Sequence, residues 1–204
     1  MKTRYHRIIT TQALIPHFSQ NALETVIAAN LKQDVWIYQF GHEHYHYDNN
    51  SFAAGNAYIA EMRRSLVDAL QCGDAISARE SFGRLTHAAQ DFYAHSNFIA
   101  LWRESRPGAS PDEIDPMFAG MLTDSRLRSG RIYYPLEAFS FIAALKPYIV
   151  PWLPRDSHAW MNIDDPSRTN FDYAYAAAVK RTELEFEQLY QLLSQEQIHL
   201  LTGN

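Results

Sequence analysis

The spacing of apolar residues constrains the fold of this chain more than any other feature of its sequence. Apolar side chains recur every three or four residues in long stretches, most clearly between Phe171 and Leu193. A period near 3.6 residues is typical of an amphipathic helix, whereas a half-buried strand needs alternation with a period of two, of which the sequence has little. The pattern therefore predicts an all-α fold, a bundle of several helices around a shared core.

Local start and stop signals divide this pattern into four long helices and two short ones. Pro16 suits the first turn of a helix, because its missing N–H needs no partner there. Asp74 is expected to cap another helix, since its carboxylate can accept a hydrogen bond from the first turn. We expect long helices at about 16–31, 51–70, 74–103 and 171–193, and short ones at about 117–122 and 136–149.

Length and composition predict a single domain over residues 1–204. A chain of 204 residues, 47% of them hydrophobic, is long enough to bury a sizeable core. Two stretches rich in turn-forming residues, near 104–116 and 124–135, are expected to be irregular loops.

Charge and hydropathy exclude some partners and suggest a location. The formal net charge is −5 and the sequence pI is about 6.0, so the chain lacks the basic surface that duplex nucleic acid requires. The first residues lack the apolar core of a secretory signal peptide, and no later stretch has the roughly 20 apolar residues of a membrane span. We therefore expect a soluble chain, cytoplasmic by default, with non-classical export as the alternative.

Cysteine usage limits the metal sites that this chain can build. Cys72 is its only cysteine, which excludes an intramolecular disulfide, a cysteine-rich zinc site and a two-thiol redox site. Any metal must therefore be held by nitrogen and oxygen atoms.

The segment FGRLTHAAQDFYAHSNF, residues 82–98, places His87, Asp91 and His95 at four-residue intervals within a predicted helix. At about 100° per residue, the three side chains span an arc of about 80° on one face, so they can converge on one point. Imidazole and carboxylate are the ligands that zinc takes when thiolate is lacking. The alternative is a solvated polar face with two incidental histidines.

A second histidine cluster lies in FGHEHYHYDNN, residues 40–50, which contains His44, His46 and Asp48. Its alternative interpretation is an aromatic-rich loop whose histidines bind backbone groups. His6 and Asp34 lie in two further segments, and with them a ligand set would be drawn from well-separated parts of the chain.

These motifs carry a resemblance to a known family. FGRLTHAAQDFYAHSNF resembles the signature helix of the Het-C heterokaryon-incompatibility family and its bacterial relatives, and ANLKQDVW, HYDNNSF and MNIDDPSRTNFDYAYAAAVKRTELEF occur in the same order as in that family. The resemblance extends from about His6 to Phe186. More distantly, the chain is similar to zinc-dependent phospholipase C and the single-strand-specific zinc nucleases. Those enzymes are multi-helix bundles that hold three metal ions between helices and hydrolyse phosphodiesters.

The resemblance implies a ligand for each metal ion. Asp34, His46 and His87 would bind one ion, and Asp91 would bridge to a second ion that His6 also binds. In the enzymes an N-terminal tryptophan also binds the second ion, but this chain begins with methionine, so that ligand is expected to be missing.

The third ion would be bound by His95. The full set of metal ligands that the resemblance implies is His6, Asp34, His46, His87, Asp91 and His95. Additional candidates are His44, Asp48, His158 and Asp165.

The predicted function follows from this ligand set. We expect a metal-dependent phosphodiester hydrolase, a phosphoesterase like phospholipase C, in which one to three zinc ions or other divalent metals activate a water. Asp91 is the candidate catalytic residue, as bridging ligand and orienter of that water. The expected substrate is a phospholipid or another phosphodiester, with peripheral membrane contact. One alternative is a Het-C-like toxin or interaction module with a structural or degenerate metal site, and another is a metal-free helical scaffold.

Overall fold

A computed structural model describes residues 1–35, 38, 41–142 and 144–204, and every regular element in this part of the chain is helical. The prediction of an all-α fold is confirmed. Among these residues, extended backbone pairs in two isolated bridges and forms no strand. Ala143, within the short helix predicted at 136–149, lies outside the described residues. The α-helices are α1 Thr3–Leu14, α2 Gln20–Lys32, α3 Phe52–Gln71, α4 Ala75–His95, α5 Phe98–Ser105, α6 Ala119–Leu122, α7 Lys146–Ile149, α8 His158–Met161, α9 Phe171–Leu192 and α10 Gln195–Thr202. The 3-10 helices are η2 Glu43–Tyr45, η3 Asp48–Asn50, η4 Pro111–Glu113, η5 Leu136–Phe141 and η6 Val150–Trp152.

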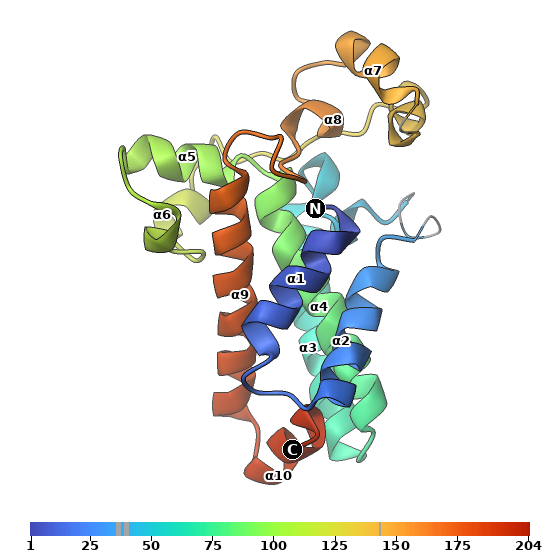
Figure 1. Cartoon of the computed structure of the whole chain (residues 1–204), viewed down its shortest axis with the longest axis vertical. Helices are drawn as coiled ribbons and strands as arrows, with labels where there is room; N and C mark the ends of the chain where they lie inside the picture. The colour runs from blue at the N-terminus through green and yellow to red at the C-terminus, as the bar shows by residue number, and fades with distance from the viewer. Residues whose placement is uncertain (36–37, 39–40, 143) are drawn as a thin grey trace.

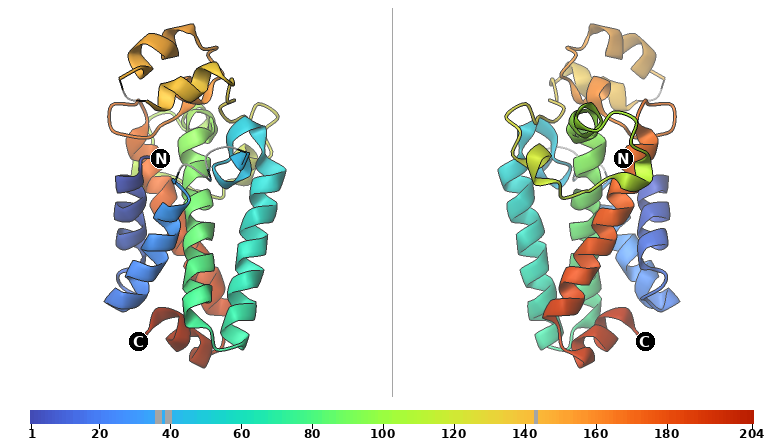
Figure 2. Two further views of the ribbon diagram at one scale, coloured as in Figure 1. Left: turned by 90° about the vertical axis from the view of Figure 1, so that its right-hand side faces the viewer. Right: turned by 90° about the vertical axis from the view of Figure 1, so that its left-hand side faces the viewer.

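Helix α4 is the central element of the bundle. It packs against α1, α2, α3 and α9, which surround it along its length (Figures 1 and 2). Every residue from Leu85 to His95 is buried, so the C-terminal half of α4 is enclosed on all faces. Polar side chains in this half must therefore find their partners inside the protein.

Gly83 allows α2 and α4 to approach closely. A Cβ at this position would lie 2.3 Å from the backbone oxygen of Val26 and 2.9 Å from the backbone nitrogen of Asn30. Because these are backbone atoms of α2, no side-chain movement could relieve the clash. The glycine therefore sets the separation of these two helices.

The helix predicted to run from Asp74 to Arg103 is divided at Ser96 and Asn97, so that prediction is wrong at its C-terminal end. Asp74 does cap α4, and its Oδ1 accepts a hydrogen bond from the backbone of Ser77 at 3.0 Å. At the other end Ser96 adopts an extended conformation and pairs with Ser129. Backbone bonds to the segment around residues 128–130 replace the helical ones, and the chain restarts as α5.

The first helix also differs from the prediction. The helix expected from about residue 16 begins at Gln20, so Pro16 lies in the turn before α2. His6 lies within α1, a helix that is absent from the predicted set. Buried Ile9 and Ala13 show the helical spacing of α1. No helix in the described part of the chain is both long and apolar enough to cross a bilayer.

Candidate metal centre

His87, Asp91 and His95 project from one face of α4 at successive turns, and all three are buried. His87 and Asp91 have no surface exposed to solvent, because α1, α2 and α9 pack around this part of α4. The interpretation of the triplet as a solvated polar face is therefore wrong.

Further histidine and aspartate side chains reach this face from separate elements. His6 comes from α1, and Asp34 follows α2. His46 directly follows η2, and Asp48 is the first residue of η3. Among the described residues, the potential ligand atoms form three groups, in each of which the atoms lie within 4.8 Å of one another. The groups are His6, Asp34 and His87; His46, His87 and Asp91; and Asp48, His95 and His158.

Asp91 lies where a bridging carboxylate would lie. Its Oδ2 is 2.9 Å from Nδ1 of His46 and 3.1 Å from Nε2 of His87. Its Oδ1 is 3.1 Å from Nε2 of His6. The two oxygens of one carboxylate therefore face different histidines, which is the arrangement required to join two neighbouring metal sites.

His6 is held in one orientation by a buried polar network. Its Nδ1 is 2.7 Å from Oε1 of Gln90, while the amide nitrogen of Gln90 donates to Thr10 and Thr182, each at 3.0 Å. Because the Gln90 oxygen can only accept, Nδ1 of His6 carries a proton, and in the neutral imidazole Nε2 then holds the lone pair. That lone pair is directed at the centre, as in metal-binding histidines oriented by an outer partner.

The third group contains Asp48, His95 and His158. Oδ1 of Asp48 lies 2.7 Å from Nδ1 of His158 and 3.5 Å from Nδ1 of His95. On the other side of the His95 ring, Nε2 lies 3.3 Å from Oδ1 of Asp164. Asp164 therefore faces a different nitrogen of His95 from the one that faces Asp48.

The nitrogen of Met1 also lies in the centre. It contacts Oδ1 of Asp91 and lies 3.1 Å from Nε2 of His95 and 3.2 Å from Oδ1 of Asp164. The family resemblance implies no ligand from residue 1, because that residue is not tryptophan. Burial lowers the pKa of the Met1 amino group, but Asp91 and Asp164 outweigh burial and raise the pKa to about 11, so the group is an ammonium that pairs with the two carboxylates.

Electrostatic interactions favour the cation-binding forms of Asp91 and His87. They act in the opposite direction on two other histidines: although burial lowers both values, Asp91 raises the pKa of His46, and Asp48 raises the pKa of His158 to about 9. Burial alone would raise the pKa of Asp91, but the Met1 amino group and His95 outweigh it and hold the pKa well below its usual range. Burial, followed by the neighbouring His6, lowers the pKa of His87 to about 4. At neutral pH, Asp91 is therefore an anion and His87 a neutral imidazole, the states in which both residues bind metal.

The donor set fits one or more divalent cations. It consists of nitrogen and oxygen atoms, as the sequence requires in the absence of a cysteine cluster. Nε2 of His6, Nε2 of His46 and Nδ1 of His87 are buried and have no hydrogen-bond partner among the described residues. Of these, Nε2 of His6 faces Asp91, 3.1 Å from its Oδ1, whereas His46 and His87 face Asp91 with the other nitrogen of each ring. Buried polar atoms in proteins are rarely left without partners, and a cation beside Asp91 would give Nε2 of His6 one.

Two of the additional candidates lie outside the three groups. His44 packs among aromatic rings, 4.4 Å from the ring centre of Tyr45 and 5.7 Å from that of Tyr58. Asp165 pairs with Lys2 and with Ser167. Its neighbour Asp164, absent from the predicted ligand set, is the carboxylate that faces the centre, and no pattern in the pair of adjacent aspartates distinguishes them.

Comparison with known proteins identifies the family. Residues 5–108, just over half of the chain, match the family model described as the VWA7 N-terminal domain. The chain belongs to this family. A stretch of 80 residues is 35% identical to human von Willebrand factor A domain-containing protein 7, and it covers 39% of this chain and 9% of the human protein. No solved structure matches the chain.

The segment shared with the VWA7 N-terminal domain contains most of the candidate ligands. It begins just before His6 and ends after His95, so the first two groups lie entirely within it. His158 and Asp164 lie beyond its end. The third group therefore combines residues of the matched segment with residues of the C-terminal half.

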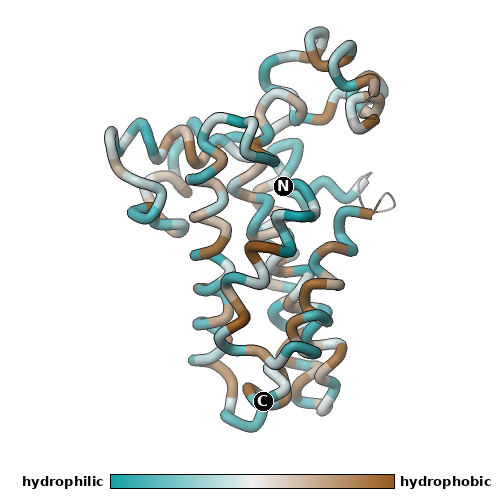
Figure 3. The backbone as a smooth tube through the Cα atoms, in the orientation of Figure 1, coloured by the Kyte–Doolittle hydropathy of each residue, from teal (hydrophilic) through white to brown (hydrophobic). Residues whose placement is uncertain are grey.

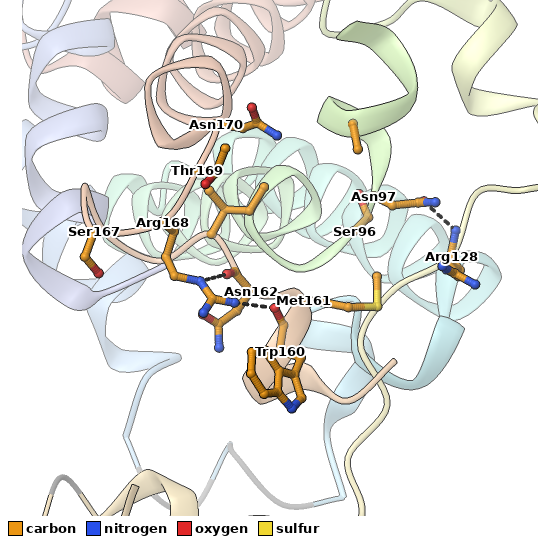
Figure 4. A pocket seen from close by; sticks show the side chains of 12 residues that line it. Ser96, Asn97, Arg128, Trp160, Met161, Asn162, Ser167, Arg168, Thr169 and Asn170 are labelled. Atoms are coloured by element: carbon orange, nitrogen blue, oxygen red, sulfur yellow. Dashed lines mark hydrogen bonds between the residues drawn. The ribbon is translucent and has the colours of Figure 1, made fainter. Parts of the chain in front are cut away.

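A pocket of about 440 Å³ is lined by residues that are close in sequence to candidate ligands (Figure 4). Ser96, which follows His95, forms one wall, and Asn162, two residues before Asp164, forms another. Arg168 stabilises the pocket wall. Its guanidinium donates hydrogen bonds to the backbone oxygens of Asn162, at 2.6 Å, and of Trp160. The pocket thus shares its walls with segments that position candidate ligands.

Proposed function

We propose that this chain holds up to three divalent cations, with zinc as the expected ion, and hydrolyses phosphodiesters of phospholipids. The observation that carries the proposal is the convergence of three buried ligand groups on the face of α4, with His87 shared by two of them and Asp91 between them. We also propose that its helical bundle has the fold of zinc-dependent phospholipase C.

Bound divalent ions would supply a water of lowered pKa and positive charge opposite the phosphoryl oxygens. The chain's own residues prepare that site. Asp91 remains ionised while buried and presents an oxygen to each side. His6 is locked by Gln90 with its lone pair directed inward. These groups need no rearrangement to bind cations, which favours a preformed site.

The charge of the centre also supports bound cations. Asp34, Asp48, Asp91 and Asp164 bring four carboxylates to one region, and the pKa of Asp34, Asp91 and Asp164 is lowered from its ordinary value. An anionic phosphodiester would be repelled by such a region unless cations reversed its charge. A phosphodiester hydrolase built on these residues therefore requires metal.

The substrate class rests on the resemblance to the Het-C family and zinc-dependent phospholipase C. Phospholipid is favoured over nucleic acid, because the chain has a formal net charge of −5 and phosphate-backbone binding requires a basic surface.

A second candidate function is an interaction module with a structural metal site. The complete burial of His87 and Asp91 favours it, since structural metal sites are closed whereas catalytic sites keep an open position. In this case the metal would stabilise the bundle without turnover.

One experiment separates the two functions. Zinc-reconstituted protein is assayed on phosphatidylcholine and on bis-p-nitrophenyl phosphate, beside the Asp91→Asn and Asp165→Asn variants. The hydrolase proposal predicts turnover that Asp91→Asn abolishes and Asp165→Asn retains, because Asp165 pairs with Lys2 outside the centre. Absence of turnover at full metal occupancy, together with a melting temperature that falls on chelation, would support the structural site instead.

A further inference from the structure

A segment of the C-terminal half leaves the bundle as a separate projection. We call residues 132–142 and 144–156 the apical lobe; it contains η5, α7 and η6. Figures 1 and 2 show it extending beyond the end of the bundle at which the N-terminus lies. His158 follows the lobe directly, so the lobe and the candidate metal centre lie at the same end of the molecule.

The root of the lobe is held firmly. Arg131 and Asp156 join its two ends through a backbone hydrogen bond of 2.8 Å, and Tyr133 donates its hydroxyl to Asp156 at 2.8 Å. The buried carboxylate of Glu137 accepts hydrogen bonds from the backbone nitrogens of Tyr133, at 2.8 Å, and Ala159, at 2.6 Å. The lobe is therefore attached at its base through specific bonds.

The remainder of the lobe exposes large apolar side chains. Trp152 is 81% exposed and Tyr148 is 74% exposed. Of the fourteen large hydrophobic side chains exposed in the described part of the chain, seven lie in this segment, and Figure 3 shows the hydrophobic residues along it. The seven are Tyr134, Leu136, Phe139, Ile142, Leu145, Tyr148 and Trp152. Such a concentration is typical of an interaction surface.

The exposed charges beyond the root of the lobe have one sign. Between positions 138 and 155, Lys146 and Arg155 are the charged residues, and both are exposed. The chain as a whole has a formal net charge of −5. The lobe also contains two carboxylates, but both lie at its root, where Glu137 is buried and Asp156 accepts a hydrogen bond from Tyr133. The exposed part of the lobe is therefore basic and apolar, on a chain that is acidic as a whole.

These features fit a lipid surface better than a second copy of the chain. Tryptophan and tyrosine are enriched where a bilayer meets water, and lysine and arginine are attracted to anionic headgroups. If two lobes met across a two-fold axis, the cations of one lobe would face those of the other with no acidic residue of positions 138–155 to pair with them. A bilayer supplies both the apolar layer and the negative charge.

We propose that the apical lobe binds the surface of membranes that contain anionic phospholipid, with Trp152 and Tyr148 entering the interface and Lys146 contacting headgroups. The proposal concerns binding and holds whether or not the metal centre turns over substrate.

Vesicle flotation tests it directly. Full-length protein is mixed with phosphatidylcholine vesicles with and without phosphatidylserine, and the bound fraction is measured. We expect binding to the vesicles that contain phosphatidylserine, and binding weaker by about tenfold or more in a Tyr148→Ser, Trp152→Ser double variant, because two large side chains no longer leave water. Lys146→Glu should weaken binding and reduce its sensitivity to salt.

The control replaces two exposed apolar side chains by serine at the other end of the molecule. Tyr190 and Leu192 are exposed on α9, away from the lobe, and Tyr190→Ser with Leu192→Ser should leave vesicle binding unchanged. Asp91→Asn should also bind vesicles normally, which separates this proposal from the hydrolase. Equal binding by the lobe variant and the wild type would overturn it, as would a wild type that binds no vesicles and dimerises through Trp152 in size-exclusion chromatography.

Discussion

The metal centre and the apical lobe depart from the usual distribution of polarity in opposite directions. Around α4, His6, His87 and Asp91 are completely buried, whereas in the lobe Tyr148 and Trp152 are almost fully exposed. Burying a charge is costly unless it is paired, and a large exposed apolar cluster is uncommon in an isolated protein. Each region is thus explained by a partner of matching chemistry, a cation in one case and a lipid surface in the other.

The contrast between the two regions would fail most clearly if Asp91 could be replaced without loss of stability. In Asp91→Asn, the surrounding histidines and the Met1 amino group lose the carboxylate that faces them, so we expect the free energy of unfolding to fall by about 3–5 kcal/mol. Urea denaturation measures this value. The control is Asp165→Asn, for which a change below about 1 kcal/mol is expected; equal effects of the two variants would contradict a special role for Asp91.

Metal removal tests the same region without mutation. A ligand that binds only the folded state at a hundred times its Kd stabilises it by about 2.7 kcal/mol, so chelation should lower the melting temperature by about 5–10 °C. Differential scanning calorimetry before and after chelation measures the shift. The melting temperature of Asp91→Asn should barely respond to the chelator, and an unchanged wild-type melting temperature would argue against bound metal.

Gln90 offers a third test of the metal centre, because it orients the candidate ligand His6. Gln90→Leu removes the acceptor that fixes the His6 ring, and loss of such an outer partner weakens metal binding by about 10–100-fold. Competition with a zinc-binding dye gives the affinity. Gln71→Leu, at the exposed end of α3, should leave it unchanged; the same loss in both variants would exclude a positioning role for Gln90.

The smallest expected effect is on the stability of the lobe. Trp152→Ala should change the free energy of unfolding by no more than about 0.5 kcal/mol, because the side chain makes little contact with the bundle. Trp102→Ala, in the core at 1% exposure, should cost about 3–5 kcal/mol. Thermal denaturation of both variants makes the measurement, and a large loss in Trp152→Ala would show that the lobe is packed rather than free to bind.

The sequence predicts the fold class well because helical periodicity is a local property. The four-residue spacing of His87, Asp91 and His95 depends on α4 alone, and Asp74 caps that helix with a bond to a residue three positions away. The division at Ser96 was not predictable in this way. It depends on pairing with Ser129, which is more than thirty residues distant.

The candidate ligands show the same limit. Asp164 and Asp165 are adjacent and chemically identical, and the backbone hydrogen bond between Ile163 and Ala94 decides which of them faces α4. The exposed face of the lobe was not foreseen either. The apolar residues between 134 and 153 predict short helices, but whether another element covers them depends on the tertiary arrangement.

Metal content per chain tests the central claim most directly. Tag-free wild-type protein and the Asp91→Asn variant are reconstituted with zinc, dialysed against a mild chelator and analysed by plasma mass spectrometry. A metal centre built on three ligand groups predicts two or three tightly held equivalents in the wild type and fewer in the variant. Less than one equivalent in the reconstituted wild type would contradict it and leave the buried histidines and aspartates as a metal-free polar core.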